Sequence, residues 1–180
     1  MSDSIFKKDN EGHERFSWSG LGDIKEGRGD LGEDVPVLVY RLMQFTMLDV
    51  LSKSLGLEEA NQYFRDAGFL AGSEFAKNVL DLKVDFDSFI ASLQQTLVDL
   101  RVGVMRVEAF DPETGKLLLT VAQDLDCSGL PITNENVCTY DEGFIAGILH
   151  AYTDKIYDVR EIDCWASGDR VCRFKADVVE

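Results

Sequence analysis

The chain has 180 residues, a formal net charge of −15 and a sequence pI of about 4.4. It is 45% hydrophobic and 28% charged, which is typical of a soluble globular protein with one compact domain. The acidic balance argues against nucleic acid and against an anionic membrane surface as partners, because both attract clustered Lys and Arg. Solubility explains the acidic surface better than a docking role does.

Residues 1–16 are polar and mixed in charge, so we expect a disordered tail without the apolar segment of a signal peptide. Residues 17–34 are rich in glycine and predict a flexible connecting segment. The Gly20-Leu21-Gly22 run in it lacks the preceding strand and the third glycine of a nucleotide-binding loop. We therefore expect a single domain over residues 17–180, located in the cytoplasm.

Three helices are predicted in the first half of the domain. The first is expected from about Pro36 to Leu55, and its apolar stretch is interrupted by Arg41, Gln44 and Asp49, which favours a buried helix over a membrane span. The second helix is expected over about residues 58–80. The third begins near Asp85, a suitable N-cap, and its apolar residues recur with the helical period as far as Leu100.

Strands dominate the pattern after Leu100, together with one more helix. That helix is expected over Thr139–Tyr152, where Thr139 and Glu142 have the spacing of a capping box. Residues 123–136 are expected to be mainly loop. The strands are predicted over residues 102–110, 117–122, 156–164 and 171–178. The fold class is therefore α/β, more specifically α+β, with the N-terminal helices packed on a small antiparallel sheet and the C-terminal helix and hairpin held by a metal.

Two glycine-flanked pentapeptides recur, Gly68-Phe-Leu-Ala-Gly72 and Gly143-Phe-Ile-Ala-Gly147. Two such short matches are too little to establish a duplication. Glycines one turn apart on a helix allow another backbone to approach closely, so both segments are interpreted as marks of tight helix packing.

Four potential metal ligands gather in the last quarter of the chain: Cys138, Glu161, Cys164 and Cys172. The predicted hairpin brings the last three together, and Cys138 lies at a helix start, where a thiolate is stabilised. A structural zinc ion usually takes four such ligands, and cytoplasmic cysteine clusters bind metals more often than they form disulfides. The alternatives are ordinary buried cysteines with an exposed glutamate, or a Cys164–Cys172 disulfide. Cys127 is expected to be a small buried hydrophobe.

The sequence offers no convincing catalytic machinery. His13 falls in the expected tail and His150 near the end of a helix, where an imidazolium suits the helix dipole better than a metal. No Ser/His/Asp set or nucleophile elbow is recognisable.

Two segments, Cys138-Thr-Tyr-Asp-Glu-Gly-Phe-Ile-Ala-Gly-Ile-Leu149 and Glu161-Ile-Asp-Cys-Trp-Ala-Ser-Gly-Asp-Arg-Val-Cys-Arg-Phe174, resemble the 4-vinyl-reductase-type domain, a family also described as hydrocarbon-binding. The family includes the sensor domains of bacterial activators that respond to aromatic hydrocarbons, and its fold is similar to subunits of the TRAPP vesicle-tethering complex. The resemblance implies a homodimer and a zinc ion held by Cys138, Glu161, Cys164 and Cys172, within a zinc subregion of about residues 137–176.

The resemblance also implies a small-molecule pocket. The phenol sensors use a histidine that this chain lacks in the central region, where Phe89 lies near its place, so a more apolar ligand is favoured. The candidate lining residues, each of which could equally be plain core, are Phe86, Phe89, Phe110, Tyr140, Phe144 and Trp165.

The leading hypothesis is a zinc-containing binding module for a small hydrophobic or aromatic ligand, acting as a sensor or accessory protein through a separate signalling partner. The first alternative is a TRAPP-like protein-interaction or assembly module. An enzyme of tetrapyrrole vinyl reduction is the second, and it would need a reductant site that the sequence does not reveal.

Overall fold

The computed structural model describes residues 6–8 and 14–179, and the side chains from Phe16 onward. It divides the chain into two compact units, residues 1–42 and 43–180, which we describe separately. In the described part of the chain no helix is long and apolar enough to cross a membrane.

The first unit contains short elements only. Strands β1 (Phe6–Lys8) and β2 (Glu14–Phe16) pair antiparallel within the segment expected to be a disordered tail, with Phe6 opposite Phe16. The rest of that expected tail lies outside the described residues. The glycine-rich segment forms a 3-10 turn, η1 (Trp18–Leu21), and a one-turn helix, α1 (Ile24–Gly27).

Four longer helices follow the order predicted from the sequence. Helix α4 begins where expected because the Asp85 carboxylate accepts a hydrogen bond from the Ser88 N–H at 3.1 Å, which satisfies a free donor of the first turn. The helices are α2 (Val37–Leu55), α3 (Leu57–Val79), α4 (Phe86–Asp99) and α5 (Thr139–Thr153).

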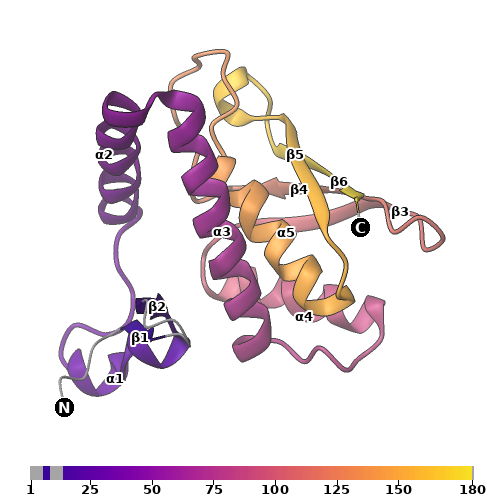
Figure 1. The fold of residues 1–180 in the computed structure, drawn as a ribbon, viewed down its shortest axis with the longest axis horizontal. Coiled ribbons are helices and arrows are strands. Elements are labelled where there is room, and N and C mark those ends of the chain that lie inside the picture. Colours follow the sequence, from indigo (N-terminus) through magenta and orange to yellow (C-terminus); the bar gives the residue numbers. More distant parts are fainter. Residues whose placement is uncertain (1–5, 9–13, 180) are drawn as a thin grey trace. The chain divides into compact units, whose positions relative to one another are not determined.

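A four-stranded antiparallel sheet completes the second unit, in the order β3-β4-β6-β5 (Figure 1). The central pair β4 and β6 comes from strands far apart in the chain, since α5 and β5 are inserted between them. The mixed architecture confirms the α+β class. The strands are β3 (Val104–Phe110), β4 (Leu117–Ala122), β5 (Tyr157–Asp163) and β6 (Cys172–Val178).

Helices α3 and α5 pack with their backbones almost in contact, through the two glycine pairs. A Cβ atom added at Gly72 would lie 2.1 Å from the Phe144 carbonyl oxygen, and one at Gly147 would lie 2.2 Å from the Phe69 carbonyl oxygen. Gly68 and Gly143 are equally close to the opposite helix. Tight helix packing is therefore what the repeated pentapeptides encode.

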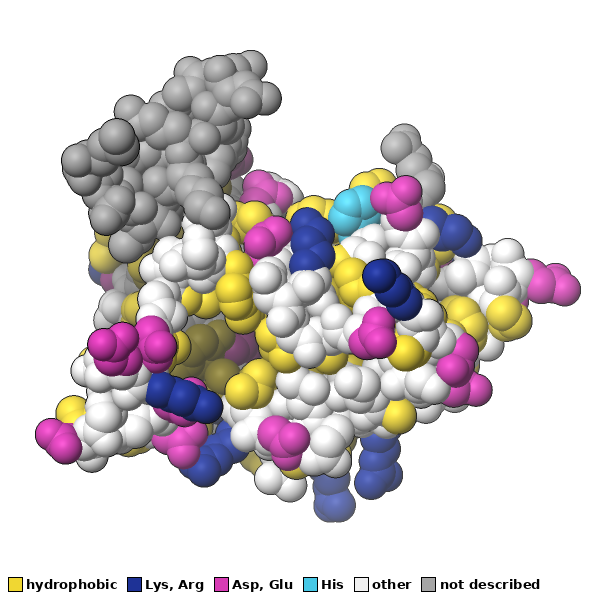
Figure 2. Space-filling view, turned by 90° about the horizontal axis from the view of Figure 1, so that it is seen from below, with side chains coloured by type: hydrophobic (Ala, Val, Ile, Leu, Met, Phe, Trp, Pro, Cys, Tyr) yellow, Lys and Arg dark blue, Asp and Glu magenta, His cyan; other side chains and the backbone are white. Residues whose placement is uncertain are grey.

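Alternation along the strands determines the core face of the sheet. Tyr157, Val159 and Glu161 are buried on β5, and Cys172 and Phe174 on β6. The pairing of Glu161 with Phe174 places the glutamate on the inner face, as the alternation predicted. On one outer face of the molecule, acidic and basic side chains are interspersed among hydrophobic ones (Figure 2).

Candidate functional site: a cysteine cluster beside an apolar pocket

The cysteine cluster lies where four chain segments meet. Cys138 precedes α5, Cys164 follows β5 and Cys172 begins β6, as the sequence predicted. Cys127 joins them from the loop after β4. All four thiols are free and buried, with at most 1% of each residue exposed. The sequence interpretation had treated Cys127 as a small hydrophobe, because the loop gave no sign of where it folds back.

The four sulfur atoms lie within 4.8 Å of one another. The Cys138 sulfur is 3.8 Å from the Cys172 sulfur and 3.9 Å from the Cys164 sulfur, and the Cys127 and Cys172 sulfurs are 3.0 Å apart. None of these separations approaches the roughly 2.05 Å of a disulfide bond. Such a donor set suits a thiophilic divalent metal such as zinc.

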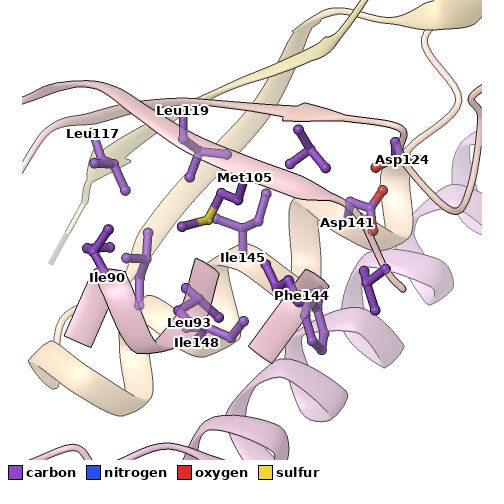
Figure 3. Close-up of a pocket in the computed structure, with 14 residues that line it drawn as sticks. Ile90, Leu93, Met105, Leu117, Leu119, Asp124, Asp141, Phe144, Ile145 and Ile148 are labelled. Atoms are coloured by element: carbon purple, nitrogen blue, oxygen red, sulfur yellow. The ribbon is translucent and has the colours of Figure 1, made fainter. Parts of the chain in front are cut away.

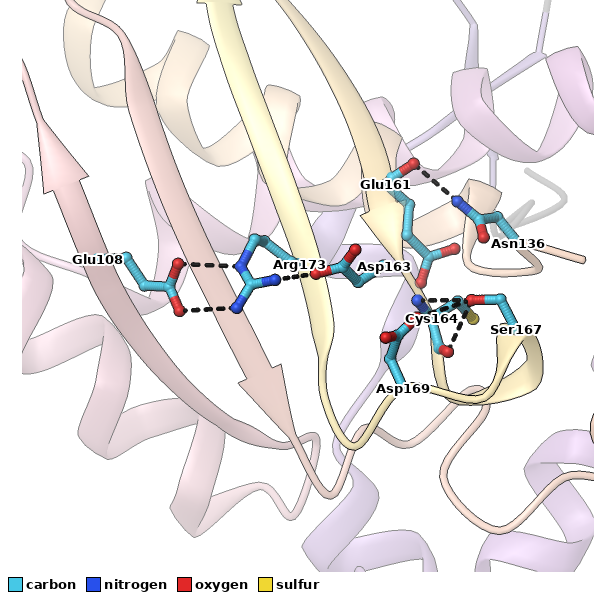
Figure 4. Close-up of polar contacts among 8 residues, drawn as sticks. All are labelled: Glu108, Asn136, Glu161, Asp163, Cys164, Ser167, Asp169 and Arg173. Atoms are coloured by element: carbon cyan, nitrogen blue, oxygen red, sulfur yellow. Dashed lines mark hydrogen bonds and ion pairs between the residues drawn. The ribbon is translucent and has the colours of Figure 1, made fainter. Parts of the chain in front are cut away.

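Cys164 is presented by a tight turn, η2 (Trp165–Ser167), drawn in Figure 4. The Ser167 hydroxyl accepts from the Cys164 N–H at 3.1 Å and donates to the Cys164 carbonyl oxygen at 2.9 Å. The same carbonyl accepts from the Asp169 N–H at 3.0 Å. This turn holds the Cys164 backbone in one conformation beside the cluster.

The sulfur atoms perturb one another strongly. Hydrogen bonding with the Cys127 thiol is the largest influence on all three of its neighbours: it lowers the pKa of Cys164 and raises the pKa of Cys138 and of Cys172. The cluster therefore favours a thiolate at Cys164, and a cation would be needed to stabilise further thiolates.

Glu161 lies against the cluster with 7% of its surface exposed. Its Oε2 atom accepts from the Cys138 N–H at 3.2 Å, whereas its Oε1 atom has no hydrogen-bond partner among the described residues. Burial, together with the charge of the Cys164 sulfur, raises the pKa of Glu161 to about 8. In Figure 4 its carboxylate points toward the turn that carries Cys164.

Glu142 connects this site to α3. Its Oε2 atom pairs with Arg65 Nε at 2.6 Å, and its Oε1 atom accepts from the Glu161 N–H at 2.9 Å. The expected capping box of Thr139 and Glu142 is therefore wrong, and Cys138 is the N-cap residue of α5. The carboxylate that the capping box required is engaged by Arg65 and by β5.

An apolar pocket lies among α4, the strands β3 and β4, and α5 (Figure 3). It encloses about 530 Å³ of space not filled by atoms, of which about 40 Å³ admits the centre of a water-sized sphere. Its apolar lining residues are Ile90, Leu93, Leu97, Val102, Met105, Leu117, Leu119, Val121, Phe144, Ile145, Ile148 and Leu149.

Two carboxyl groups, those of Asp124 and Asp141, lie together at one end of this pocket (Figure 3). Burial raises the pKa of both, and the charges of Asp126 and Asp124 raise that of Asp141 further. Neighbouring carboxyls in this situation share a proton and can both donate and accept hydrogen bonds. The sequence analysis missed this pair, for which an aspartate in the first turn of a largely apolar helix was the available signal.

Of the six predicted pocket residues, the structure places Phe144 in this pocket. Phe89 is completely buried and stacks on Tyr152 at 4.0 Å between ring centroids. Phe86 and Phe110 stack at 4.0 Å and line a neighbouring cavity of about 160 Å³, which shares Leu117 and Leu149 with the first.

The remaining two predicted pocket residues lie elsewhere. The Tyr140 ring neighbours Phe144, with 6.4 Å between centroids. The Trp165 indole donates to the Leu130 carbonyl oxygen at 3.1 Å. The predicted set is thus divided among the pocket, a second cavity and the core.

Residues 117–178 match the family model of the 4-vinyl-reductase-type domain, which confirms the resemblance noted in the sequence. Among curated proteins, the chain is 25% identical over 152 residues to the uncharacterized protein MJ1642 of Methanocaldococcus jannaschii. That alignment covers 84% of this chain and 83% of the relative.

Three solved structures share the fold. A vinyl-4-reductase family protein from Methanocaldococcus jannaschii aligns with a TM-score of 0.57 and 14% identity, covering 83% of this chain and 85% of that one. The phenol-responsive sensory domain of the transcription activator PoxR, solved with phenol, gives a TM-score of 0.60 and 17% identity, covering 80% and 75%. A trafficking protein particle complex subunit 3 from Naegleria fowleri, covalently bound to palmitic acid, gives 0.58 and 12%, covering 81% and 98%.

Proposed function

We propose that this protein, whose C-terminal part matches the 4-vinyl-reductase-type domain, binds a compact and mostly apolar small molecule and acts as a sensor or accessory protein. The observation that carries the proposal is the apolar pocket among α4, β3, β4 and α5. Pockets lined by hydrophobic side chains with a few convergent polar groups are the usual sites for small ligands. The limited free volume favours a ligand of about the size of one aromatic ring.

The carboxyl pair at the pocket end gives the ligand an orientation. Asp124 and Asp141 offer a donor and an acceptor to a hydroxyl or similar head group, while the apolar walls hold the ligand body. The fold shared with the phenol-responsive domain of PoxR supports this ligand class. Without the histidine of the phenol sensors, the carboxyl pair would have to provide the polar contact.

A zinc ion is the second part of the proposal. Cys138, Cys164 and Cys172 would hold it, with Glu161 or Cys127 as the fourth ligand. The residues fit such an ion, because the sulfur atoms are buried and close and a buried Glu161 oxygen lacks a hydrogen-bond partner among the described residues. Bound there, zinc would connect the start of α5 to the β5–β6 hairpin and stabilise the fold.

Displacement of a polarity-sensitive fluorophore, 1-anilinonaphthalene-8-sulfonate, tests ligand binding. We expect saturable binding that phenol or toluene reverses, and its loss in Ile145→Phe, because the added ring fills the pocket. Ile132→Phe, at a side chain that is 66% exposed, is the matched control and should bind normally. Equal binding by parent and Ile145→Phe would contradict the pocket as the ligand site.

A homodimer with a TRAPP-like assembly role is the second candidate. Met43, Met47 and Val50 are 59%, 52% and 61% exposed on one stripe of α2, an unusual cost for a surface helix unless a partner covers it. Light scattering should show a dimer that Met47→Glu converts to a monomer, with Lys53→Glu, on another face of the helix, as the control. A monomeric parent would contradict this candidate.

A further inference from the structure

The position of Cys127 follows from a turn that Asp124 organises. The Asp124 Oδ1 atom accepts from the N–H groups of Asp126 and Cys127, at 2.9 and 3.1 Å. Val121, the strand residue before this turn, pairs with Cys172 on β6. The turn thus directs the chain back toward Cys172 and leaves Cys127 0% exposed inside the cluster.

The separations of the sulfur atoms match tetrahedral coordination in most of the cluster. With Zn–S bonds of about 2.3 Å, the sulfurs of a tetrathiolate site lie about 3.8 Å apart. The Cys138–Cys172 and Cys138–Cys164 separations, 3.8 and 3.9 Å, agree with this value. The Cys127–Cys172 separation of 3.0 Å is shorter, and it would lengthen as the loop residue moves away from the strand residue.

Glu161 is engaged differently. One carboxylate oxygen accepts the Cys138 N–H, and the Glu161 carbonyl oxygen accepts from the Asn136 side chain at 2.8 Å (Figure 4). These two contacts fix the segment that presents Cys138. Among the described residues, the set of four donors within 4.8 Å of one another consists of the cysteines, and Glu161 is not part of it.

We infer that Cys127 supplies the fourth ligand of a tetrathiolate metal centre and that Glu161 is a positioning residue that orients Cys138. The inference rests on the metal centre proposed above and differs from the three-cysteine, one-glutamate set that the family resemblance implies. Its chemical consequence is a centre selective for thiophilic ions such as zinc, cobalt and cadmium.

Zinc X-ray absorption spectroscopy of the full chain, loaded with zinc under reducing conditions, tests this assignment. We expect four sulfur neighbours near 2.3 Å in the parent and in Glu161→Gln, and three sulfurs with one lighter atom near 2.0 Å in Cys127→Ser. Zinc affinity should fall at least about tenfold in Cys127→Ser, as measured by competition with a chromophoric chelator.

Each contrary outcome is distinct. Three sulfurs and one oxygen in the parent, with the oxygen lost in Glu161→Gln, would overturn the assignment of Cys127 and leave the metal centre standing. A parent that binds no zinc would overturn the metal centre itself. If Cys127→Ser fails to fold, the parent and Glu161→Gln spectra still decide between the two ligand sets.

Discussion

Helix α5 carries two regions of opposite character. At its start, Cys138 joins a cluster whose four sulfurs are almost fully shielded from solvent. Further along, Phe144, Ile145 and Ile148 face a pocket with about 530 Å³ of unfilled space. Its glycines meanwhile lie against α3. The contrast indicates a division of labour, in which close contacts fix the helix and the loosely filled side is left for a ligand.

The largest effect on this comparison is expected from Cys164→Ser. Removing one ligand of a buried set should lower the free energy of unfolding by about 3–5 kcal/mol, because the remaining charged donors lose their balance. Thermal unfolding and metal content measured on the same samples would check it. A variant that melts like the parent would show that the cluster does not staple the fold.

Gly147→Ala should have the next largest effect. The added methyl group would lie 2.2 Å from the Phe69 carbonyl oxygen, so α3 and α5 must separate, at a cost of about 1–3 kcal/mol. Gly27→Ala is the matched control, since no atom lies within 4 Å of its added Cβ. Chemical denaturation of both variants would measure the difference, and equal stabilities would remove the argument from close helix packing.

Asp141→Asn is expected to have the smallest effect, and its sign is opposite. Because burial raises the folded-state pKa of Asp141, stability is lost as pH rises from the unfolded value of 3.8 through the folded one. The amide avoids that loss, so the variant should be more stable than the parent at pH 7.5 and equally stable below pH 3.8, where the parent carboxyl is protonated in both states. Denaturation midpoints at the two pH values would test it, and a less stable variant at pH 7.5 would contradict it.

Local patterns were sufficient to predict the elements of the second unit. The helical period of α4, the Asp85 cap and the alternation on β5 and β6 all report on burial within one element, which depends on the residue sequence directly. The glycine pentapeptides also predicted a close contact, although not which helices would share it.

Contacts between elements were harder to predict. The return of Cys127 to the cluster depends on a side-chain-capped turn and on the β4–β6 register, which no local pattern encodes. The aromatic residues were assigned to the pocket by residue type, but Phe89 is committed to Tyr152 and Phe86 to Phe110. Short aliphatic side chains line most of the pocket, and residue type does not distinguish them from ordinary core.

Isoleucine-methyl NMR during titration with phenol or toluene would test the central claim most directly. Binding in the pocket predicts saturable shifts of the methyl signals of Ile90, Ile145 and Ile148, which line it, with little change at Ile132 and Ile162, which are 66% and 48% exposed. Unchanged pocket methyls at saturating concentrations of both probes, or shifts confined to the exposed isoleucines, would contradict the proposed ligand-binding function.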